Sequence, residues 1–250
     1  MSIQTEIDRI AGNVAAALEA CGNKGVAVPS GSTSDDLPTI IAAIEAGGGG
    51  GGDLAAQIVE RTVTELCDAT IVSVGAYALY SCSQLTSVEL PACTTVNNYA
   101  FGSCSQLTSV ELPACTRAYD SAFRSCSQLT SVELPACLSV GTNAFNSCSR
   151  LTSVELPACT TVNNYAFNGC SQLTSVVLRS ESVCKLSNIN AFTKCYHILG
   201  TANATYNPDG LKDGYIYVPD ALVEDYKVAT NWSTYADQIK PLSEHVEVTA

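Results

Sequence analysis

Cysteine recurs at a fixed interval through the middle of the chain. Cys82, Cys104 and three later cysteines follow one another at a constant sequence offset of 22 (104 − 82 and onward), and a second series begins at Cys93, midway between the first two. Between the two series runs Cys-Ser-Gln-Leu-Thr-Ser-Val-Glu-Leu-Pro-Ala-Cys, which occurs four times with one change, Arg150 in place of Gln. A repeat of this length predicts a solenoid, in which each coil buries its apolar side chains only against its neighbours.

Each unit is predicted to contain one short strand and a return segment. In the stretch 85–90, apolar residues alternate with Ser87 and Glu89, which is the two-residue period of a strand with one buried face. Pro91 ends this strand because it has no N–H to donate. An Ala-Phe pair ending at Phe101 is available to point inward on the return. Stacked copies would lie ~4.8 Å apart, so we expect a parallel sheet and a core of aligned columns.

This repeat resembles the BspA-like branch of the leucine-rich repeat family, which is found in bacterial surface and phage-related proteins. The resemblance rests on L-x-x-V-x-L-P at residues 85–91 and A-F-x-x-C at residues 100–104, with their later copies, and it covers roughly residues 63–198. It implies an α+β repeat solenoid, a curved right-handed coil with short parallel strands on one side. It also implies a role in binding rather than in catalysis, without naming a ligand.

Thirteen cysteines raise the question of disulfides or zinc sites. In stacked parallel strands, like residues keep their Cβ atoms ~4.8 Å apart, whereas a disulfide needs roughly 3.5–4.5 Å. Zinc sites normally pair cysteines two to four residues apart, and the sequence has no such pair. We therefore predict columns of buried, reduced thiols that pack as small apolar side chains, with no metal and no cofactor.

The chain divides into four segments on composition and pattern. These are an N-terminal helical segment (1–46), a glycine linker (47–52), the solenoid (53–198) and a C-terminal cap (199–250). The six consecutive glycines of the linker predict a flexible tether, because such a run has no side chains to pack.

The first helix, predicted over residues 2–21, spaces its apolar residues by four and three. This is the spacing of heptad positions a and d, and isoleucine at both favours three or more strands. The candidate oligomerisation residues are Ile3, Ile7, Ile10 and Val14. The alternative is an ordinary amphipathic helix that packs on its own chain. Residues 24–44 are similar to N-terminal segments of phage and prophage structural proteins.

Both ends of the solenoid depart from the repeat. Residues 58–66 should form an atypical first strand, and the last unit carries three extra residues near 179–183. Residues 215–219 are predicted to form a strand, and Asp220 is predicted to cap a following helix. This ending resembles the C-terminal cap of BspA-like proteins. A cap is required because the last coil would otherwise expose its apolar columns.

The first candidate ligand-binding set lies on the solvent side of the predicted strands. If like charges on neighbouring strands stack, they repel one another, so a glutamate column either attracts cations or a basic partner, or is a solvated face that resists edge association. The set consists of a serine column and a glutamate column: Ser87, Ser109, Ser131, Ser153, Glu89, Glu111, Glu133 and Glu155.

The second candidate set comes from the segment in which the copies differ. After the second cysteine the four units read Thr-Thr-Val-Asn-Asn-Tyr, Thr-Arg-Ala-Tyr-Asp-Ser, Leu-Ser-Val-Gly-Thr-Asn and Thr-Thr-Val-Asn-Asn-Tyr, while the rest is nearly constant. Exposed aromatic and polar groups of this kind occur on recognition surfaces, and drift on an unconstrained turn is the alternative. The candidates, expected to be exposed, are Asn98, Tyr99, Arg117, Tyr119, Asp120, Arg124 and Tyr165.

Composition argues against several classes of function. The formal charge of −12, with no basic cluster, argues against a nucleic-acid surface, and no apolar run has the length of a membrane span. The two histidines, His197 and His245, have no cysteine or serine motif beside them. We therefore expect no enzymatic activity.

These features together predict a non-enzymatic binding or adhesion module that contacts a protein or a cell-surface glycan, with a homotrimer as the favoured oligomer. The favoured setting is a phage or prophage virion-associated protein that touches a host surface. The alternatives are a BspA-like bacterial surface adhesin and an intracellular interaction scaffold. Residues 1–9 show no secretory signal pattern, so a virion, or a cell surface reached by a non-standard route, is favoured over the cytoplasm.

Overall fold

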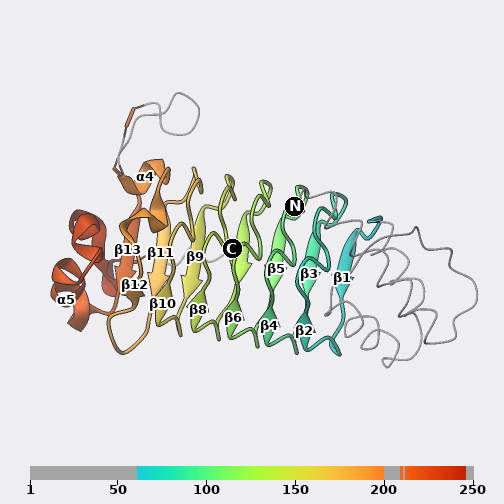
Figure 1. Ribbon diagram of the computed structural model, residues 1–250. Helices are drawn as coiled ribbons and strands as arrows, with labels where there is room; N and C mark the ends of the chain where they lie inside the picture. The colour runs from blue at the N-terminus through green and yellow to red at the C-terminus, as the bar shows by residue number, and fades with distance from the viewer. Residues whose placement is uncertain (1–60, 200–208, 211, 246–250) are drawn as a thin grey trace, which may run out of the picture.

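The computed structural model describes residues 61–199, 209–210 and 212–245. In this part of the chain, one coil follows another in a row that begins at β1 and ends at α5 (Figure 1). The predicted helical segment 1–46 and the linker 47–52 lie outside the described residues, so these assignments stay predictions.

One strand of each coil joins an eight-stranded parallel sheet, and in the repeated units it lies at the position that the alternating pattern predicts. The first strand, β1, shares only Glu65 and Leu66 with the predicted range 58–66, because residues 61–64 are not in a strand. In β1, β3, β5 and β7 the middle residue is buried and its two neighbours face outward, as in the Ser-Val-Glu strand at β3. Strand pairing joins equivalent positions of successive copies, as in Val88 with Val110. In sheet order the strands are β1 (Glu65–Cys67), β3 (Ser87–Glu89), β5 (Ser109–Glu111), β7 (Ser131–Glu133), β9 (Ser153–Leu156), β11 (Ser175–Leu178), β13 (Tyr215–Val218) and β14 (Ile239–Pro241).

A second parallel sheet, with six strands, runs beside the first (Figure 1). The resemblance implied strands on one side only, and the structure corrects that expectation. Each of these strands has two residues, which is too short to show an alternating pattern, although most carry a β-branched residue that favours extended backbone. They are β2 (Ser73–Val74), β4 (Thr95–Val96), β6 (Arg117–Ala118), β8 (Ser139–Val140), β10 (Thr161–Val162) and β12 (Lys185–Leu186).

The return segment of each coil is hydrogen-bonded to the next coil although it contains no strand. The backbone N–H groups of Tyr99, Phe101 and Ser103 donate to carbonyls of the next coil at 3.1, 2.8 and 2.7 Å. Tyr99 and Ser103 have positive φ values of 56° and 61°, a left-handed conformation that is uncommon outside glycine. This backbone alternation directs every second N–H toward the neighbouring coil.

The predicted phenylalanine column forms the centre of the core. Phe101, Phe123, Phe145, Phe167 and Phe192 are fully buried, and neighbouring rings stack at 5.2–5.5 Å with interplanar angles of 3–6°. Parallel rings at this distance gain dispersion energy in addition to that of apolar burial. The repeat period therefore orders the core ring by ring.

The thiols are buried and free, as the spacing predicts, with one exception. Of the twelve cysteines in the described part of the chain, only Cys67 is exposed. Each thiol of the first series, from Cys104 onward, donates to the carbonyl three residues before its counterpart in the preceding coil, for example Cys126 to Phe101 at 3.1 Å. In the second series, Cys93 donates to Thr95 at 3.4 Å. These thiols are hydrogen-bond donors as well as apolar fillers.

The three extra residues of the last unit are divided between two places. Thr161 pairs with Lys185, an offset of 24 (185 − 161) instead of 22, so two extra residues precede β12. Phe145 donates its N–H to Ala166 and Phe167 donates to Ala191, so the offset of this bond grows by three, from 21 (166 − 145) to 24 (191 − 167). The third extra residue therefore follows β12, which corrects the prediction that placed all three near 179–183.

Aromatic side chains cover the C-terminal end of the stack. Trp232 packs against Phe192, and its Nε1–H donates to the carbonyl of Cys184 at 2.6 Å. The hydroxyl of Tyr226 accepts from the N–H of Cys184 at 2.8 Å. Besides β13 and β14, this region contains η1 (Ile189–Phe192), α4 (Tyr196–Leu199), η2 (Asp220–Leu222), α5 (Val223–Val228), η3 (Trp232–Gln238) and η4 (Leu242–Glu244).

Asp220 does not cap the helix that follows it. The first residues after β13 form η2, and neither η2 nor α5 has a side-chain cap. The Oδ1 atom of Asp220 instead accepts the N–H of Ser243 at 3.1 Å. Hydrogen bonding from the side chain of Ser243, and then from its backbone N–H, lowers the pKa of the Asp220 carboxyl. Asp220 thus ties η2 to η4, a contact distant in sequence that no local pattern reveals.

Candidate binding faces

The outer face of the eight-stranded sheet carries the serine and glutamate columns. The serine and the glutamate of each Ser-Val-Glu sequence point away from the core. The strand pairing places each glutamate beside the next, for example Glu89 beside Glu111 and Glu133 beside Glu155. The structure therefore brings the eight residues of the first candidate set onto one face. That this face binds a ligand is a proposal.

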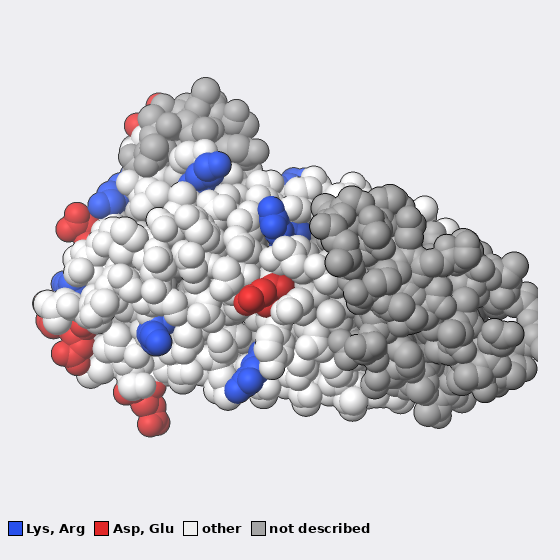
Figure 2. Space-filling view, in the orientation of Figure 1, with Lys and Arg blue, Asp and Glu red and all other residues white. Residues whose placement is uncertain are grey.

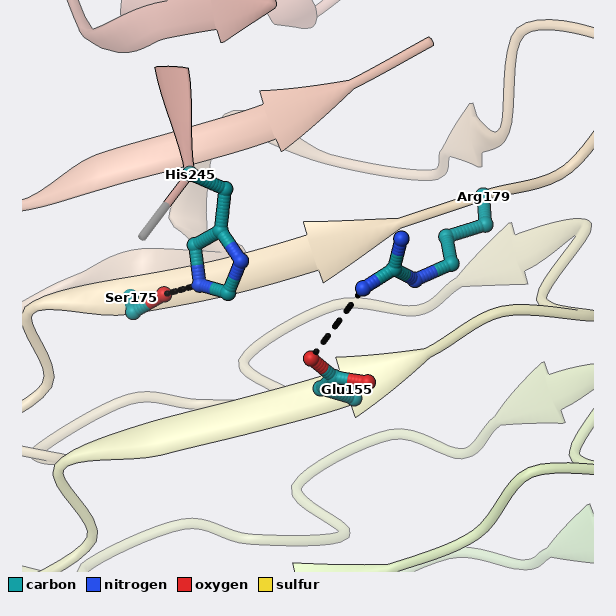
Figure 3. Close-up of polar contacts among 4 residues, drawn as sticks. All are labelled: Glu155, Ser175, Arg179 and His245. Carbon is teal, nitrogen blue, oxygen red and sulfur yellow. Dashed lines mark hydrogen bonds and ion pairs between the residues drawn. The ribbon is translucent and has the colours of Figure 1, made fainter. Parts of the chain in front are cut away.

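Different side chains lie beside the two ends of the glutamate column. Val177 takes the next position and is buried, and the guanidinium of Arg179 lies over the column with Nη2 3.5 Å from Oε1 of Glu155 (Figure 3). At the other end, Cys67 pairs with Glu89 and its thiol lies 3.7 Å from Oε2 of that residue. The neighbouring carboxylate raises the pKa of the Cys67 thiol above its ordinary value.

Beyond β11, aromatic and basic side chains take the place of the glutamates on the same face. Tyr217 follows Val177 in the column, and Lys240 follows Tyr217. The ring of His245 packs on Tyr217 at 4.6 Å, and its Nε2 lies 3.5 Å from Oγ of Ser175 (Figure 3). The alternation Tyr-Ile-Tyr-Val in β13 signals that both tyrosines share a face, but their place beside the serine and glutamate columns is visible only in the folded chain.

The second candidate set lies around the six-stranded sheet, away from the glutamate column. Arg117 belongs to β6, and Tyr119, 37% exposed, places its hydroxyl 3.4 Å from Nη1 of Arg117. Asp120, Arg124 and Asn98 are also exposed. These residues occupy the variable segments of the first and second units.

Two tyrosines of this set are half-buried, contrary to expectation. Tyr99 stacks on Tyr77 at 4.9 Å, and the Tyr165 hydroxyl accepts from Nδ2 of Asn190 at 3.4 Å. Both lie in the return segment of their coil and adopt positive φ values, 56° and 55°. No sequence pattern signals this conformation, since tyrosine is rare in it.

The described residues offer little for metal chemistry. Among them, no three His, Cys, Asp or Glu side chains gather as ligands of a metal ion. In the view of Figure 2, only a few Lys, Arg, Asp and Glu side chains are visible among the white residues of the solenoid. Within the described ranges no helix is long and apolar enough to span a bilayer.

Solved structures with a similar fold include two bacterial proteins. A leucine-rich repeat protein from Bacteroides ovatus ATCC 8483 is 23% identical, with a TM-score of 0.51 over 72% of this chain and 42% of its own. The pneumococcal vaccine antigen PcpA is 13% identical, with a TM-score of 0.51 over 72% of this chain and 40% of its own. No curated protein matches significantly.

Both structural likenesses show the fold, and this chain covers less than half the length of either protein. The family described as "BspA type Leucine rich repeat region (6 copies)" matches residues 71–199, more than half of the 250 residues. The chain therefore belongs to the BspA-type leucine-rich repeat family.

Proposed function

We propose that this chain is a non-catalytic binding module that docks a protein partner on the outer face of the eight-stranded sheet. The observation that supports this most directly is the register of the strands, which fixes four serines and four glutamates in two straight columns. A rigid core holds these side chains in place, so a partner meets a pre-organised surface and loses less entropy on binding.

The partner is expected to present lysine or arginine side chains to the glutamate column. Arg179 beside Glu155 is an intramolecular example of that contact, since its guanidinium reaches the column from the loop after β11. The tyrosines of β13 lie on the same sheet beyond the glutamates. They offer the amphipathic aromatic surface that is enriched in protein interfaces.

The setting that we favour is display on a surface with many copies of the partner. Oligomerisation through residues 1–46 and a tether at residues 47–52 would let several weak sites act together and gain avidity. A virion that contacts a host cell is the favoured setting, and a bacterial cell surface is the alternative. A cell-surface glycan, in place of a protein, is the alternative ligand.

Pull-down of the full chain on intact bacterial envelopes tests the proposal, with Bacteroides ovatus among the species. The variant Glu111→Gln/Glu133→Gln removes two charges from the column, and we expect it to reduce binding on the order of tenfold. The matched control, Glu181→Gln/Glu224→Gln, removes two exposed charges elsewhere. Protease treatment of the envelopes should abolish binding, whereas glycosidase treatment should not.

Binding should also weaken as salt rises, because exposed charge pairs are screened. Equal binding by the two double variants, at every salt concentration, would exclude the glutamate column as the docking surface.

A further inference from the structure

Two adjacent units of the solenoid differ from the other two at positions where the difference has a structural cost. The variable segments of the first and fourth units are identical, at 94–99 and 160–165. The second and third units depart from that sequence on the outer face of the six-stranded sheet. Three exposed departures define what we call the β6–β8 patch: Arg117, Tyr119 and Leu138. A fourth departure, Gly141, is buried.

Leu138 interrupts a ladder of threonine hydroxyl bonds. Thr116 donates its hydroxyl to the carbonyl of Thr94 at 3.2 Å, and Thr160 donates to the carbonyl of Leu138 at 3.0 Å. Leucine at the intervening position has no hydroxyl to donate to Thr116, and its side chain is 44% exposed. Compared with threonine in the other units, leucine at this position therefore loses a hydrogen bond and exposes apolar surface.

Tyr119 and Gly141 interrupt a second ladder. In the first and fourth units, Asn97 and Asn163 donate Nδ2–H to a carbonyl of the preceding coil at 3.0 and 2.9 Å. Glycine has no side chain to donate such a bond, and the hydroxyl of Tyr119 lies beside Nη1 of Arg117 instead. A Cβ at residue 141 would lie 2.5 Å from the carbonyl carbon of Tyr119, so glycine is needed where the chain passes this close to Tyr119.

The three residues of the patch are neighbours on one surface. Arg117 pairs with Ser139 in the sheet, the residue after Leu138, and its Nη1 lies 3.4 Å from the hydroxyl of Tyr119. The N–H of Leu138 donates to Thr116, the residue before Arg117, at 2.9 Å. An arginine, a tyrosine and an exposed leucine thus lie together, and arginine and tyrosine are enriched in binding hot spots.

Residues that break a local structural rule without a compensating gain in stability occur at functional sites. We propose that the β6–β8 patch is a second docking site, separate from the eight-stranded sheet, for a protein segment that presents a carboxylate beside an apolar side chain. The carboxylate pairs with the guanidinium of Arg117, and the apolar side chain covers Leu138 beside the ring of Tyr119. An exposed leucine offers sugar hydroxyls no hydrogen bond, which favours a protein segment over a glycan.

The experiment uses a yeast-displayed library of random 12-residue peptides, selected on the full-length chain. The test variant, Arg117→Thr/Tyr119→Asn/Leu138→Thr, gives the second and third units the residues of the first and fourth. The control variant is Glu181→Gln/Glu224→Gln, which removes two exposed charges outside both the β6–β8 patch and the glutamate column. We expect enriched peptides with Asp or Glu next to a large apolar residue, and on the order of tenfold weaker binding to the test variant than to the control.

Thermal unfolding of the test variant separates recognition from folding. The restored hydroxyl and amide bonds should keep its Tm at or above that of the unmodified chain. A lower Tm would show that the patch serves the fold and would overturn the proposal. Failure to enrich acidic-apolar peptides, or equal binding to the test and control variants, would overturn it as well.

Discussion

In the coils between residues 82 and 169, most hydrogen bonds recur at the same position in every unit, whereas each bond of the cap, residues 212–245, occurs once. The thiol of Cys126 donates to Phe101, and its counterpart Cys148 donates to Phe123. In the cap, the side chains of Trp232 and Asn231 each donate one hydrogen bond to a backbone carbonyl of the last coil. A contact of the coils can therefore be predicted from the sequence repeat, whereas a contact of the cap has no copy from which it could be predicted.

The two regions also differ in the chemistry that stabilises them. The coils bury cysteine in two columns, and the cap contains no cysteine. The cap relies on tyrosine and tryptophan side chains that pack as a cluster and bond to the backbone of the last coil. Conditions that ionise thiols should therefore act on the coils before they act on the cap.

Alkaline pH should have the largest effect. Burial raises the pKa of Cys82 and Cys137 from the ordinary 9.0 to about 11, and that of Cys115 to about 12. A raised pKa in the folded state means stability that is fully present below the ordinary thiol pKa and is lost as pH rises through the folded one. Between these two pKa values, each such thiol lowers the free energy of unfolding by about 1.4 kcal/mol per pH unit. Circular dichroism should therefore show the coils unfolding between about pH 9 and 11.

Two features make this pH prediction specific. Burial raises the pKa of Tyr226 and Tyr235 from 10.0 to about 12, so the contribution of these cap residues should begin to fall only above the ordinary tyrosine pKa of 10.0, whereas that of the thiols begins to fall above 9.0. The variant Cys126→Ala/Cys148→Ala should show a shallower fall of stability with pH. An unchanged slope would mean that the buried thiols are not the cause.

Removal of one ring from the phenylalanine column should have the next largest effect. Phe123 lies between Phe101 at 5.3 Å and Phe145 at 5.2 Å, and Phe123→Ala should reduce the free energy of unfolding by roughly 3–5 kcal/mol. Because each coil contacts only its neighbours, the loss should weaken the middle of the solenoid. Urea denaturation measures it, with Phe123→Leu as the milder control. An unchanged midpoint would contradict the inward position of this ring.

The strand positions, the buried phenylalanine column and the buried thiols follow from the repeat, because a constant period leaves each residue type one place in the coil. Other features lack any such signal. The two-residue strands are too short for a pattern, and the positive φ of Tyr99 contradicts the preference of tyrosine. The bond from Asp220 to Ser243 joins two residues far apart in a region without a repeat.

The candidate sites show the same division. The serine and glutamate columns could be placed on one face because strand periodicity fixes their direction. The half-burial of Tyr99 and Tyr165 could not be predicted, since it depends on stacking with Tyr77 and on the contact with Asn190. The contribution of β13 to the outer face depends on a strand pairing that is distant in sequence, such as Ser175 with Tyr215.

A single hydrogen bond of the cap should matter less than a core ring. Trp232→Phe keeps most of the aromatic packing and removes the Nε1–H that the carbonyl of Cys184 accepts. An unsatisfied buried acceptor costs about 1–3 kcal/mol, so we expect a loss in this range in urea denaturation. Tyr217→Phe, on the outer face of β13, is the matched aromatic control. A loss no larger than that of the control would show that the bond does not secure the cap.

The smallest effect, of opposite sign, is expected on the glutamate column. Glu133 lies between Glu111 and Glu155 in register, and like charges on neighbouring strands destabilise by about 0.2–1 kcal/mol. Glu133→Gln should therefore raise the free energy of unfolding slightly, and added salt should diminish the gain. Glu181→Gln, outside the column, should leave it unchanged. Destabilisation by Glu133→Gln would show that the column is not under repulsion.

Thermal unfolding of two shortened chains, followed by circular dichroism, tests the contrast between repeated coils and unique cap most directly. The first chain lacks residues 104–125, which form one complete coil, and joins Ser103 to Cys126 as the native units join serine to cysteine. The second ends at residue 210 and lacks the cap. We predict a cooperative transition at a modestly lower Tm for the first chain, and loss of the cooperative transition for the second. A first chain that does not fold, or a second chain that melts like the intact protein, would contradict the account.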